Sequence, residues 1–383
     1  AQDAAEVDEE QEHSEAELRE KLDALQGSLA ELQGEQPLVF HSVDAAAVAS
    51  VVEDWTGIPV GSMVKDEIDS ILNMTDHLRK RVVGQDHGLE MIVSRVQTSR
   101  AQLDNPTKPI GVFMLCGPSG VGKTETALAL AESLYGGEQN LITINMSEFQ
   151  EAHTVSTLKG APPGYVGYGE GGVLTEAVRQ RPYSVVLLDE VEKADPEVMN
   201  LFYQVFDKGV LSDGEGRIID FKNTLVIMTS NLASEVIMQM ASGPVPPTME
   251  ELAGAIRPVL SQHFKPALLA RMELVPFFPL PQEILKEIIK LKLKTVANRL
   301  RDSHRMSFEH EPRVEEVIAS RCTEVETGAR NIDHIINQTL LPMLSTSLLE
   351  RMSEGPLPDS VRVGIGEGEA FTLVFGEAIE KGD

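Results

Sequence analysis

Residues 117–124 read Gly-Pro-Ser-Gly-Val-Gly-Lys-Thr, a complete G-x-x-x-x-G-K-T phosphate-binding loop. An apolar stretch at 110–116 precedes the loop and predicts a buried strand, and the Ala- and Leu-rich segment 125–134 after it predicts a helix. Glycines allow the backbone to curl so that its N–H groups and the helix N-terminus surround a triphosphate. Because strand, loop and helix occur in the order that this chemistry requires, the sequence predicts that the chain binds a nucleoside triphosphate.

Individual side chains of the loop have expected roles. Lys123 is expected to reach the β- and γ-phosphates, and the hydroxyl of Thr124 is expected to ligate Mg²⁺. The other loop residues expected to contact the nucleotide are Pro118, Ser119, Gly120, Val121 and Gly122.

The composition is that of a folded, multidomain protein. Its 383 residues suffice for two or three domains of about 150 residues each. Hydrophobic residues make up 42% of the chain, yet no apolar run approaches the roughly 18 residues of a membrane span, and the acidic start does not resemble a secretory signal. Two cysteines, Cys116 and Cys322, do not make a disulfide framework, so a reducing, cytoplasmic location is expected.

The charge balance bears on the choice of partner. The net charge of −27 argues against nucleic acid, because phosphate binding needs a basic surface. Part of this excess is local, since residues 1–36 contain twelve Asp or Glu, and it is interpreted as a solvated face.

The pattern along the chain predicts four regions. Residues 1–36 hold an acidic, amphipathic leucine helix at 14–33 with a coiled-coil spacing. Residues 37–280 begin with mainly helical sequence and then alternate apolar strands with helices, at 110–116, 141–146, 184–188, 224–229 and 273–278. This rhythm predicts an α/β fold, a parallel sheet between helices. Residues 281–376 predict a smaller α+β domain, with helices at 282–302, 312–322 and 330–350 and strands at 360–364 and 370–375, before a tail at 377–383.

Two further strand ends carry polar side chains. The strand 184–188 ends in Asp189, which can hold Mg²⁺, and Glu190, which can polarise a water for attack on the γ-phosphate. The next strand ends in Thr-Ser-Asn231, where ordinary turn chemistry is an equally simple explanation. If that strand lies between the strands of the phosphate loop and of Asp189, as in the additional-strand P-loop ATPases, Asn231 faces the same water as Glu190.

The segment 160–172, Gly-Ala-Pro-Pro-Gly-Tyr-Val-Gly-Tyr-Gly-Glu-Gly-Gly, has six glycines and is not expected to form a packed element. It nevertheless carries Tyr165, Val166 and Tyr168, which are costly to expose. A flexible surface loop with incidental aromatic residues is one interpretation. The other is a mobile loop that grips an extended polymer through apolar contacts.

Together these residues resemble the Clp family of AAA+ protein-remodelling ATPases, specifically the second ATPase module of its double-ring members. The similarity covers roughly residues 50–376. Its marks are Trp55-Thr-Gly-Ile-Pro-Val60, Arg81-Val-Val-Gly-Gln85, the phosphate loop, 160–172, 187–193, 213–217 and 220–224.

The resemblance implies roles that nothing local in the sequence specifies. Val82 and Val83 would line the adenine pocket, helped by Ile288. Asn231 would be the first sensor, and Arg330, after Ala329, the second sensor at the γ-phosphate. Arg271 would be an arginine finger that reaches the neighbouring subunit's site, and Tyr165 with Val166 would form the pore loop. A finger supplied in trans implies a ring, by family a hexamer.

Within the family the chain is most similar to the ClpV branch, which disassembles contracted type VI secretion sheaths in bacteria, and next to the ClpB disaggregases. The pointers include 124–132, 157–172 and 201–209. The segment 232–270 lacks the Ile-Gly-Leu/Phe tripeptide by which relatives dock the ClpP protease, so no ClpP partner is expected. Because the resemblance is to the second module only, we expect the first ATPase module and the recognition domain to lie outside this sequence, and the leucine helix to be a remnant of the coiled-coil region between modules.

Two hypotheses of other classes stay open at this point. One is a nucleotide-dependent module that holds a ring together with little turnover. The other is a nucleic-acid motor, which the acidic balance and the tyrosine-bearing loop disfavour.

Overall fold

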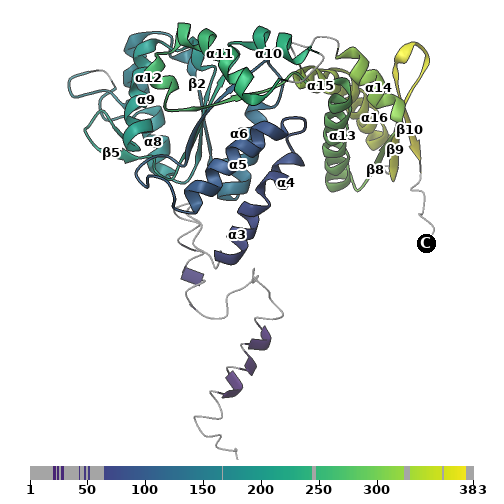
Figure 1. The fold of residues 1–383 in the computed structure, drawn as a ribbon. Coiled ribbons are helices and arrows are strands. Elements are labelled where there is room, and N and C mark those ends of the chain that lie inside the picture. The colour runs from purple at the N-terminus through teal and green to yellow at the C-terminus, as the bar shows by residue number, and fades with distance from the viewer. Residues whose placement is uncertain are drawn as a thin grey trace, which may run out of the picture.

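The computed structural model describes residues 64–165, 167–243, 247–322, 328–355 and 358–376, with scattered residues between 20 and 51. A larger domain built on a parallel sheet lies beside a smaller domain of helices and a short sheet (Figure 1). Of the predicted leucine helix, residues 20–22, 24–25 and 27–29 are described and helical. The rest of that helix, the motif at 55–60, Val166 and the tail lie outside the described residues.

The central sheet has five strands in the order β2-β3-β6-β1-β7, and every neighbouring pair is parallel. Its strands are β1 (Gly111–Cys116), β2 (Leu141–Asn145), β3 (Val185–Asp189), β6 (Leu225–Ser230) and β7 (Glu273–Pro276). The predicted parallel sheet is therefore confirmed. The strand that precedes Asn231 lies between the strand of the phosphate loop and the strand of Asp189, which is the order on which the Asn231 hypothesis depended.

Helices cover both faces of this sheet (Figure 1). Alternate residues of each strand contribute to two cores, as Phe113 and Leu115 do to one and Met114 and Cys116 to the other. The first core packs against α3 (Val64–Leu72), α4 (Met74–Arg79), α5 (Asp86–Arg100) and α6 (Lys123–Tyr135). The second packs against α7 (Val155–Lys159), α8 (Val173–Gln180), α9 (Pro196–Lys208), α10 (Ser234–Ala241), α11 (Met249–His263) and α12 (Pro266–Leu269).

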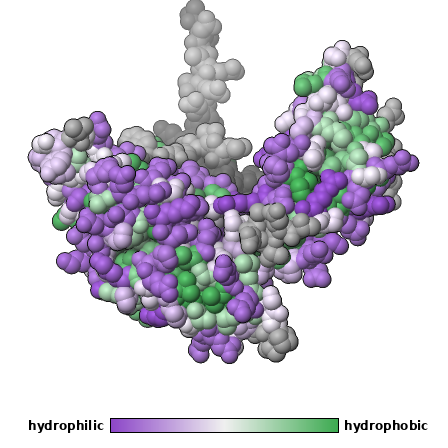
Figure 2. All heavy atoms as spheres, turned by 90° about the horizontal axis from the view of Figure 1, so that it is seen from above, coloured by the Kyte–Doolittle hydropathy of each residue, from purple (hydrophilic) through white to green (hydrophobic). Residues whose placement is uncertain are grey.

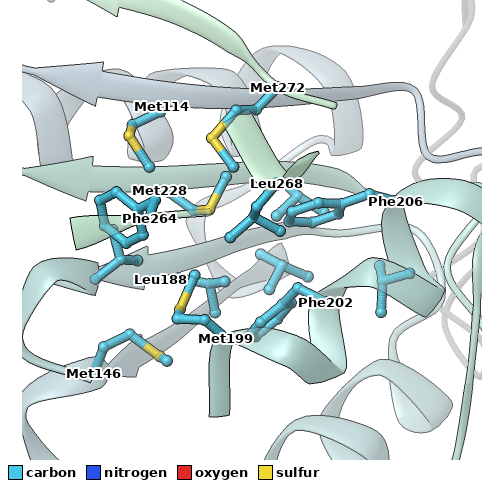
Figure 3. Packing of buried hydrophobic residues seen from close by; sticks show 14 of the residues in the cluster. Met114, Met146, Leu188, Met199, Phe202, Phe206, Met228, Phe264, Leu268 and Met272 are labelled. Atoms are coloured by element: carbon cyan, nitrogen blue, oxygen red, sulfur yellow. The ribbon is translucent and has the colours of Figure 1, made fainter. Parts of the chain in front are cut away.

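The second core is rich in methionine. Met114 and Met228 extend from the sheet toward Met199, Phe202 and neighbouring apolar side chains of the covering helices (Figure 3). Unbranched methionine side chains fill irregular gaps between the larger rings. Burial on both faces explains why these strands read as continuous apolar runs in the sequence.

A two-stranded hairpin, β4 (Val210–Ser212) and β5 (Ile218–Asp220), follows α9 and was not predicted. Its turn supports the base of the segment 160–172, because the Gly214 amide donates to the Lys159 carbonyl over 2.9 Å. A Cβ on Gly214 would lie 2.5 Å from the carbonyl oxygen of Ala161. The described residues of 160–172 form no helix or strand, as expected from their glycine content.

The smaller domain has a three-stranded sheet in the order β10-β9-β8. Its elements are α13 (Gln282–His304), β8 (Ser307–His310), α14 (Pro312–Arg321), α15 (Ala329–Ile335), a π-helical turn (Ile336–Leu340), α16 (Leu341–Glu354), β9 (Ser360–Ile365) and β10 (Phe371–Gly376). The predicted helix at 330–350 is interrupted by the π turn, and β8, which pairs in parallel with β9, was not predicted. The domain boundaries drawn from the sequence stay predictions.

Hydrophilic side chains dominate the visible surface of both domains, broken by small apolar areas (Figure 2). Among the described helices, none is both long and apolar enough to cross a membrane.

Candidate nucleotide site

A cavity of about 550 Å³ opens where the carboxyl ends of the central strands meet the smaller domain. Ligands of open α/β sheets bind at this edge, because the loops that follow the strands converge there. The predicted residues that line the cavity are Val82, Val83, Ser119, Gly120, Val121, Gly122, Lys123, Thr124, Asp189, Glu190, Asn231, Ile288, Ala329 and Arg330. The structure therefore brings together residues that the sequence separates by as many as 248 positions, since 330 − 82 = 248.

The phosphate loop has the backbone that its glycines predict. Gly122 has φ +102°, a region that side chains with a Cβ rarely adopt, and α6 starts directly after it. The first N–H groups of α6 therefore point into the cavity without partners in their own helix, and the helix dipole favours an anion there.

Lys123 is buried, and its Nζ donates to the carbonyls of Gly117 (2.5 Å) and Pro118 (3.0 Å) and to Oδ1 of Asn231 (2.9 Å). Burial lowers the pKa of Lys123 to about 8, against the opposing influence of Cys116, Glu192 and Asp189. The ammonium group is thus held by two carbonyl oxygens of the loop and by the Asn231 side chain that follows β6.

Asp189 and Glu190 are organised by Thr229 of the neighbouring strand. The Thr229 hydroxyl donates to Oδ1 of Asp189 and accepts from the Glu190 amide over 3.1 Å. Glu190 has φ +57°, which is uncommon for a residue other than glycine, and its Oε2 pairs with Lys193 Nζ at 2.7 Å. Strained backbone conformations of this kind cluster at functional sites.

Asn231 lines the same cavity as Glu190, and its side-chain oxygen accepts a hydrogen bond from Lys123. Its backbone N–H donates to Oε1 of Glu192 over 3.1 Å. The carboxylate of Glu192 thereby links the turn after β3 to the turn after β6.

The smaller domain touches the phosphate loop directly. The Ala329 amide donates to the carbonyl of Gly120 over 2.9 Å, and a Cβ on Gly328 would lie 2.7 Å from that same oxygen. This contact places Arg330, in the first turn of α15, at the cavity wall.

The residues to which the resemblance gives a role in adenine binding, Val82, Val83 and Ile288, line the same cavity. Val82 is buried, and the buried side chain of Gln85 holds the segment by donating to the carbonyls of Val121 (3.2 Å) and Phe278 (2.9 Å). Opposite this segment, α13 contributes Ile288 together with residues one turn apart, namely Leu291, Thr295 and Asn298.

Family comparisons agree with this geometry. Residues 108–275 match an AAA domain family (Cdc48 subfamily), and residues 280–363 match the C-terminal D2-small domain of ClpB protein. The chain is 58% identical over 373 residues to the AAA+ ATPase ClpV1 of Pseudomonas aeruginosa. This alignment covers 97% of the chain and 41% of ClpV1. The chain belongs to the Clp family of AAA+ ATPases.

Two ClpB chaperones are less similar to the chain than ClpV1 is. The chaperone protein ClpB of Yersinia enterocolitica is 50% identical over 332 residues, and that of Meiothermus ruber is 42% identical over 353 residues. These alignments cover 86% and 92% of the chain, and 37% and 40% of the relatives. The chain thus spans about two fifths of the length of the Clp proteins it matches.

Three predicted site residues lie outside the cavity wall, and a fourth cannot be placed. Pro118 belongs to the loop but does not line the cavity, and its carbonyl accepts a hydrogen bond from Lys123. Arg271 lies just before β7, at the amino ends of the strands, whereas the cavity lies at their carboxyl ends. Its Nε donates to Oδ1 of Asp207 over 2.6 Å. Tyr165 is 70% exposed on the segment 160–172, and Val166 lies outside the described residues.

Several residues that line the cavity were not predicted, including Thr229, Lys80, Arg81, Glu125 and Asp333. Thr229 was visible as part of the Thr-Ser-Asn strand end, but its contact with Asp189 depends on strand register. Arg81 and Glu125 belong to quoted motifs, although nothing in the sequence shows that they meet.

The donor set suits a nucleotide with Mg²⁺. Mg²⁺ takes oxygen ligands, keeps several waters, and needs only one or two protein groups beside the phosphates. Thr124 and Asp189 supply a hydroxyl and a carboxylate on the same cavity wall. Among the described residues there is no cluster of three His, Cys, Asp or Glu that could hold a metal without such phosphates.

Proposed function

We propose that this chain is an ATP-hydrolysing module of a ring that remodels proteins in the bacterial cytoplasm. The observation that carries the proposal is the convergence of Lys123, Glu190, Asn231 and Arg330 on one cavity. This set contains a charge partner for the phosphates, a base for water and two sensors, which exceeds what nucleotide binding alone requires.

Each side chain contributes a distinct step. Bound ATP with Mg²⁺ supplies the phosphoryl group to be transferred. Lys123 and Arg330 neutralise charge on the phosphate oxygens, and Thr124 with Asp189 would hold the metal. Glu190 polarises the attacking water, for which its carboxylate must leave Lys193.

The position of Arg271 supports a ring. It lies away from the cavity of its own subunit, against Asp207 and over the ring of Tyr203 at 5.4 Å. We propose that this arginine enters the site of a neighbouring subunit, so that hydrolysis depends on assembly, by family a hexamer.

The segment 160–172 is the proposed contact with polypeptide. Tyr165 and Tyr168 are 70% and 52% exposed. The start of the segment packs against Gly214 in the turn of the β4–β5 hairpin, and Gly172 at its other end packs against the backbone of 158–160. Aromatic contacts of this kind do not depend on substrate sequence, which a threading motor requires.

For the substrate we propose contracted type VI secretion sheaths, because the identity to ClpV1 is higher and covers more of the chain than the identity to the ClpB proteins. General disaggregation of the ClpB type is the alternative, and no ClpP protease partner is proposed. The test incubates the full-length protein and ATP with contracted sheath tubes or with heat-aggregated protein.

Shortening of sheath tubes in electron micrographs, without clearing of the aggregates, supports the sheath assignment. Clearing of the aggregates alone favours the ClpB alternative. Tyr165→Ala should abolish either activity while leaving ATP turnover within about twofold, since the residue lies outside the nucleotide cavity. Turnover at the uncatalysed background in an assembled ring would instead favour the ring-assembly module.

A further inference from the structure

Arg81 lies among three carboxylates that come from a different part of the chain. Its Nε donates to Glu125, its Nη1 to Glu132 over 2.6 Å, and its Nη2 to Glu138. Each nitrogen of the guanidinium therefore has its own carboxylate partner, in the fork geometry that suits arginine and not lysine. The Arg81 side chain is 27% exposed, which makes this a partly buried ion network.

The three carboxylates lie along the helix that begins in the phosphate loop and in the short turn after it. Glu125 and Glu132 lie two turns apart on α6, and Glu138 belongs to the short 3-10 helix Glu138–Asn140 after it. Partial burial disfavours the charged guanidinium, but the carboxylates outweigh this, and the pKa of Arg81 is raised. Arg81 therefore stays charged and binds the three carboxylates along α6 and the turn after it. We call these four residues the Arg81 clamp.

The clamp lies at the start of the segment that forms the adenine wall. Val82 follows directly, and its Cγ1 is 3.6 Å from the point where Gly122 would carry a Cβ. Gln85 fixes the other end of the segment on Val121 and Phe278. Arg81 and Glu125 themselves line the cavity.

We propose that Arg81 is a positioning residue that sets the affinity for the adenine nucleotide, by fixing the Val82–Val83 wall to α6 through Glu125, Glu132 and Glu138. The network spans 44 to 57 residues of sequence, so it holds two separate segments in one arrangement. The proposal rests on the proposed ATP site and on the adenine role that the resemblance gives to Val82 and Val83, and it is independent of the substrate and the ring proposed above.

Arg79 offers a matched control. It also pairs with three carboxylates, Asp76, Asp86 and Glu90, at 2.6 to 3.2 Å. All of these partners lie on or beside α4 and α5, and Arg79 does not line the cavity. Arg79→Ala removes the same charge and the same number of ion pairs without releasing the adenine wall.

The test measures Kd for a fluorescent ATP analogue on the chain, and competition by ATP and by inorganic triphosphate. Relative to Arg79→Ala, Arg81→Ala should weaken ATP binding about tenfold, the order expected for losing charged hydrogen bonds that are partly exposed. Binding of inorganic triphosphate, which has no base to contact Val82 and Val83, should differ between the two variants by less than about twofold. Circular dichroism establishes that both variants are folded.

Equal weakening of ATP binding by Arg79→Ala and Arg81→Ala would overturn the proposal, because charge alone would then explain the effect. An equal loss for ATP and inorganic triphosphate in Arg81→Ala would overturn it as well. If Arg81→Ala does not fold, Arg81→Lys replaces it, since one ammonium keeps the charge but cannot span the three carboxylates. Arg81→Lys should then weaken ATP binding at least about threefold, and unchanged binding would contradict the inference.

Discussion

The amide of Ala329, in the smaller domain, donates a hydrogen bond to the carbonyl of Gly120, in the phosphate loop. The two residues come from different domains and are joined at 2.9 Å. A change in the phosphate loop is therefore transmitted directly to α15 and to the position of Arg330. This contact joins the loop that would hold the phosphates directly to the smaller domain.

Gly328→Ala should break this connection. Gly328 has φ +49°, and an added Cβ would lie 2.7 Å from the Gly120 oxygen and 2.9 Å from that of Ser119, both backbone atoms that cannot give way. We expect a loss of about 1–3 kcal/mol in stability and about tenfold or more in ATP affinity, measured by thermal unfolding and calorimetry.

Gly254→Ala is the control, because Gly254 lies exposed within α11 with nothing near its Cβ position. That substitution should stabilise by about 0.5–1 kcal/mol and leave ATP affinity unchanged. Equal ATP affinity in the two variants would contradict the role given to the Ala329–Gly120 contact.

Thr229→Val replaces the side chain by one of nearly the same volume. It should lower ATP turnover about 10- to 100-fold, which is the range expected when a group that orients a metal ligand is lost. The hydroxyl holds both the Asp189 carboxylate and the Glu190 amide, and valine offers neither bond. Thr98→Val, which removes only a bond to Ser94 within α5, is the control. Wild-type turnover in Thr229→Val, measured as phosphate release, would show that this bridge is dispensable.

Arg271→Ala should abolish turnover while ATP affinity stays unchanged, because the side chain is outside the cavity of its own subunit. Mixing Arg271→Ala with Glu190→Gln subunits should restore part of the turnover. In a mixed ring some sites combine an intact Glu190 with an intact Arg271 from the neighbour. A mixture as inactive as either variant alone, in assembled protein, would mean that Arg271 does not act across the interface.

Cys116 should resist thiol reagents. Its side chain is fully buried at the end of β1, and burial raises the pKa of the thiol from 9.0 to about 12. With Ellman's reagent at pH 8, the folded chain should titrate one thiol, the half-buried Cys322, and the unfolded chain two. Two rapidly reacting thiols in the folded chain would contradict the packing around β1.

The same shift has a consequence for stability. The pKa of the Cys116 thiol is higher in the folded chain than in the unfolded chain. The contribution of this thiol to the free energy of unfolding is therefore fully present below pH 9 and is lost as the pH rises through about 12. The free energy of unfolding should therefore fall over this interval, and Cys116→Ala should remove that part of the pH dependence.

The sequence predicted the central sheet because its strands are buried on both faces and appear as continuous apolar runs. β1 and β6, for example, begin within one residue of the predicted limits. The half-exposed β8 and the three-residue strands β4 and β5 carry no comparable signal, and they were missed.

Motifs likewise predicted the residues around the phosphates, but not the bonds between them. The bridge from Thr229 to Asp189 depends on the register that pairs Leu188 with Met228, which places the following residues side by side. The ion network of Arg81 depends on partners 44 to 57 residues away. Such contacts follow from the topology of the sheet and not from local spacing.

In the proposed mechanism Glu190 is the base that activates water for ATP hydrolysis within an assembled ring. The most direct measurement is ATP turnover with light-scattering mass for wild type, Glu190→Gln and the exposed control Glu197→Gln. We expect ring-sized masses with ATP and Mg²⁺, turnover in wild type and Glu197→Gln, and a loss of at least about 100-fold in Glu190→Gln with ATP still bound. Undiminished turnover in assembled Glu190→Gln would contradict the account.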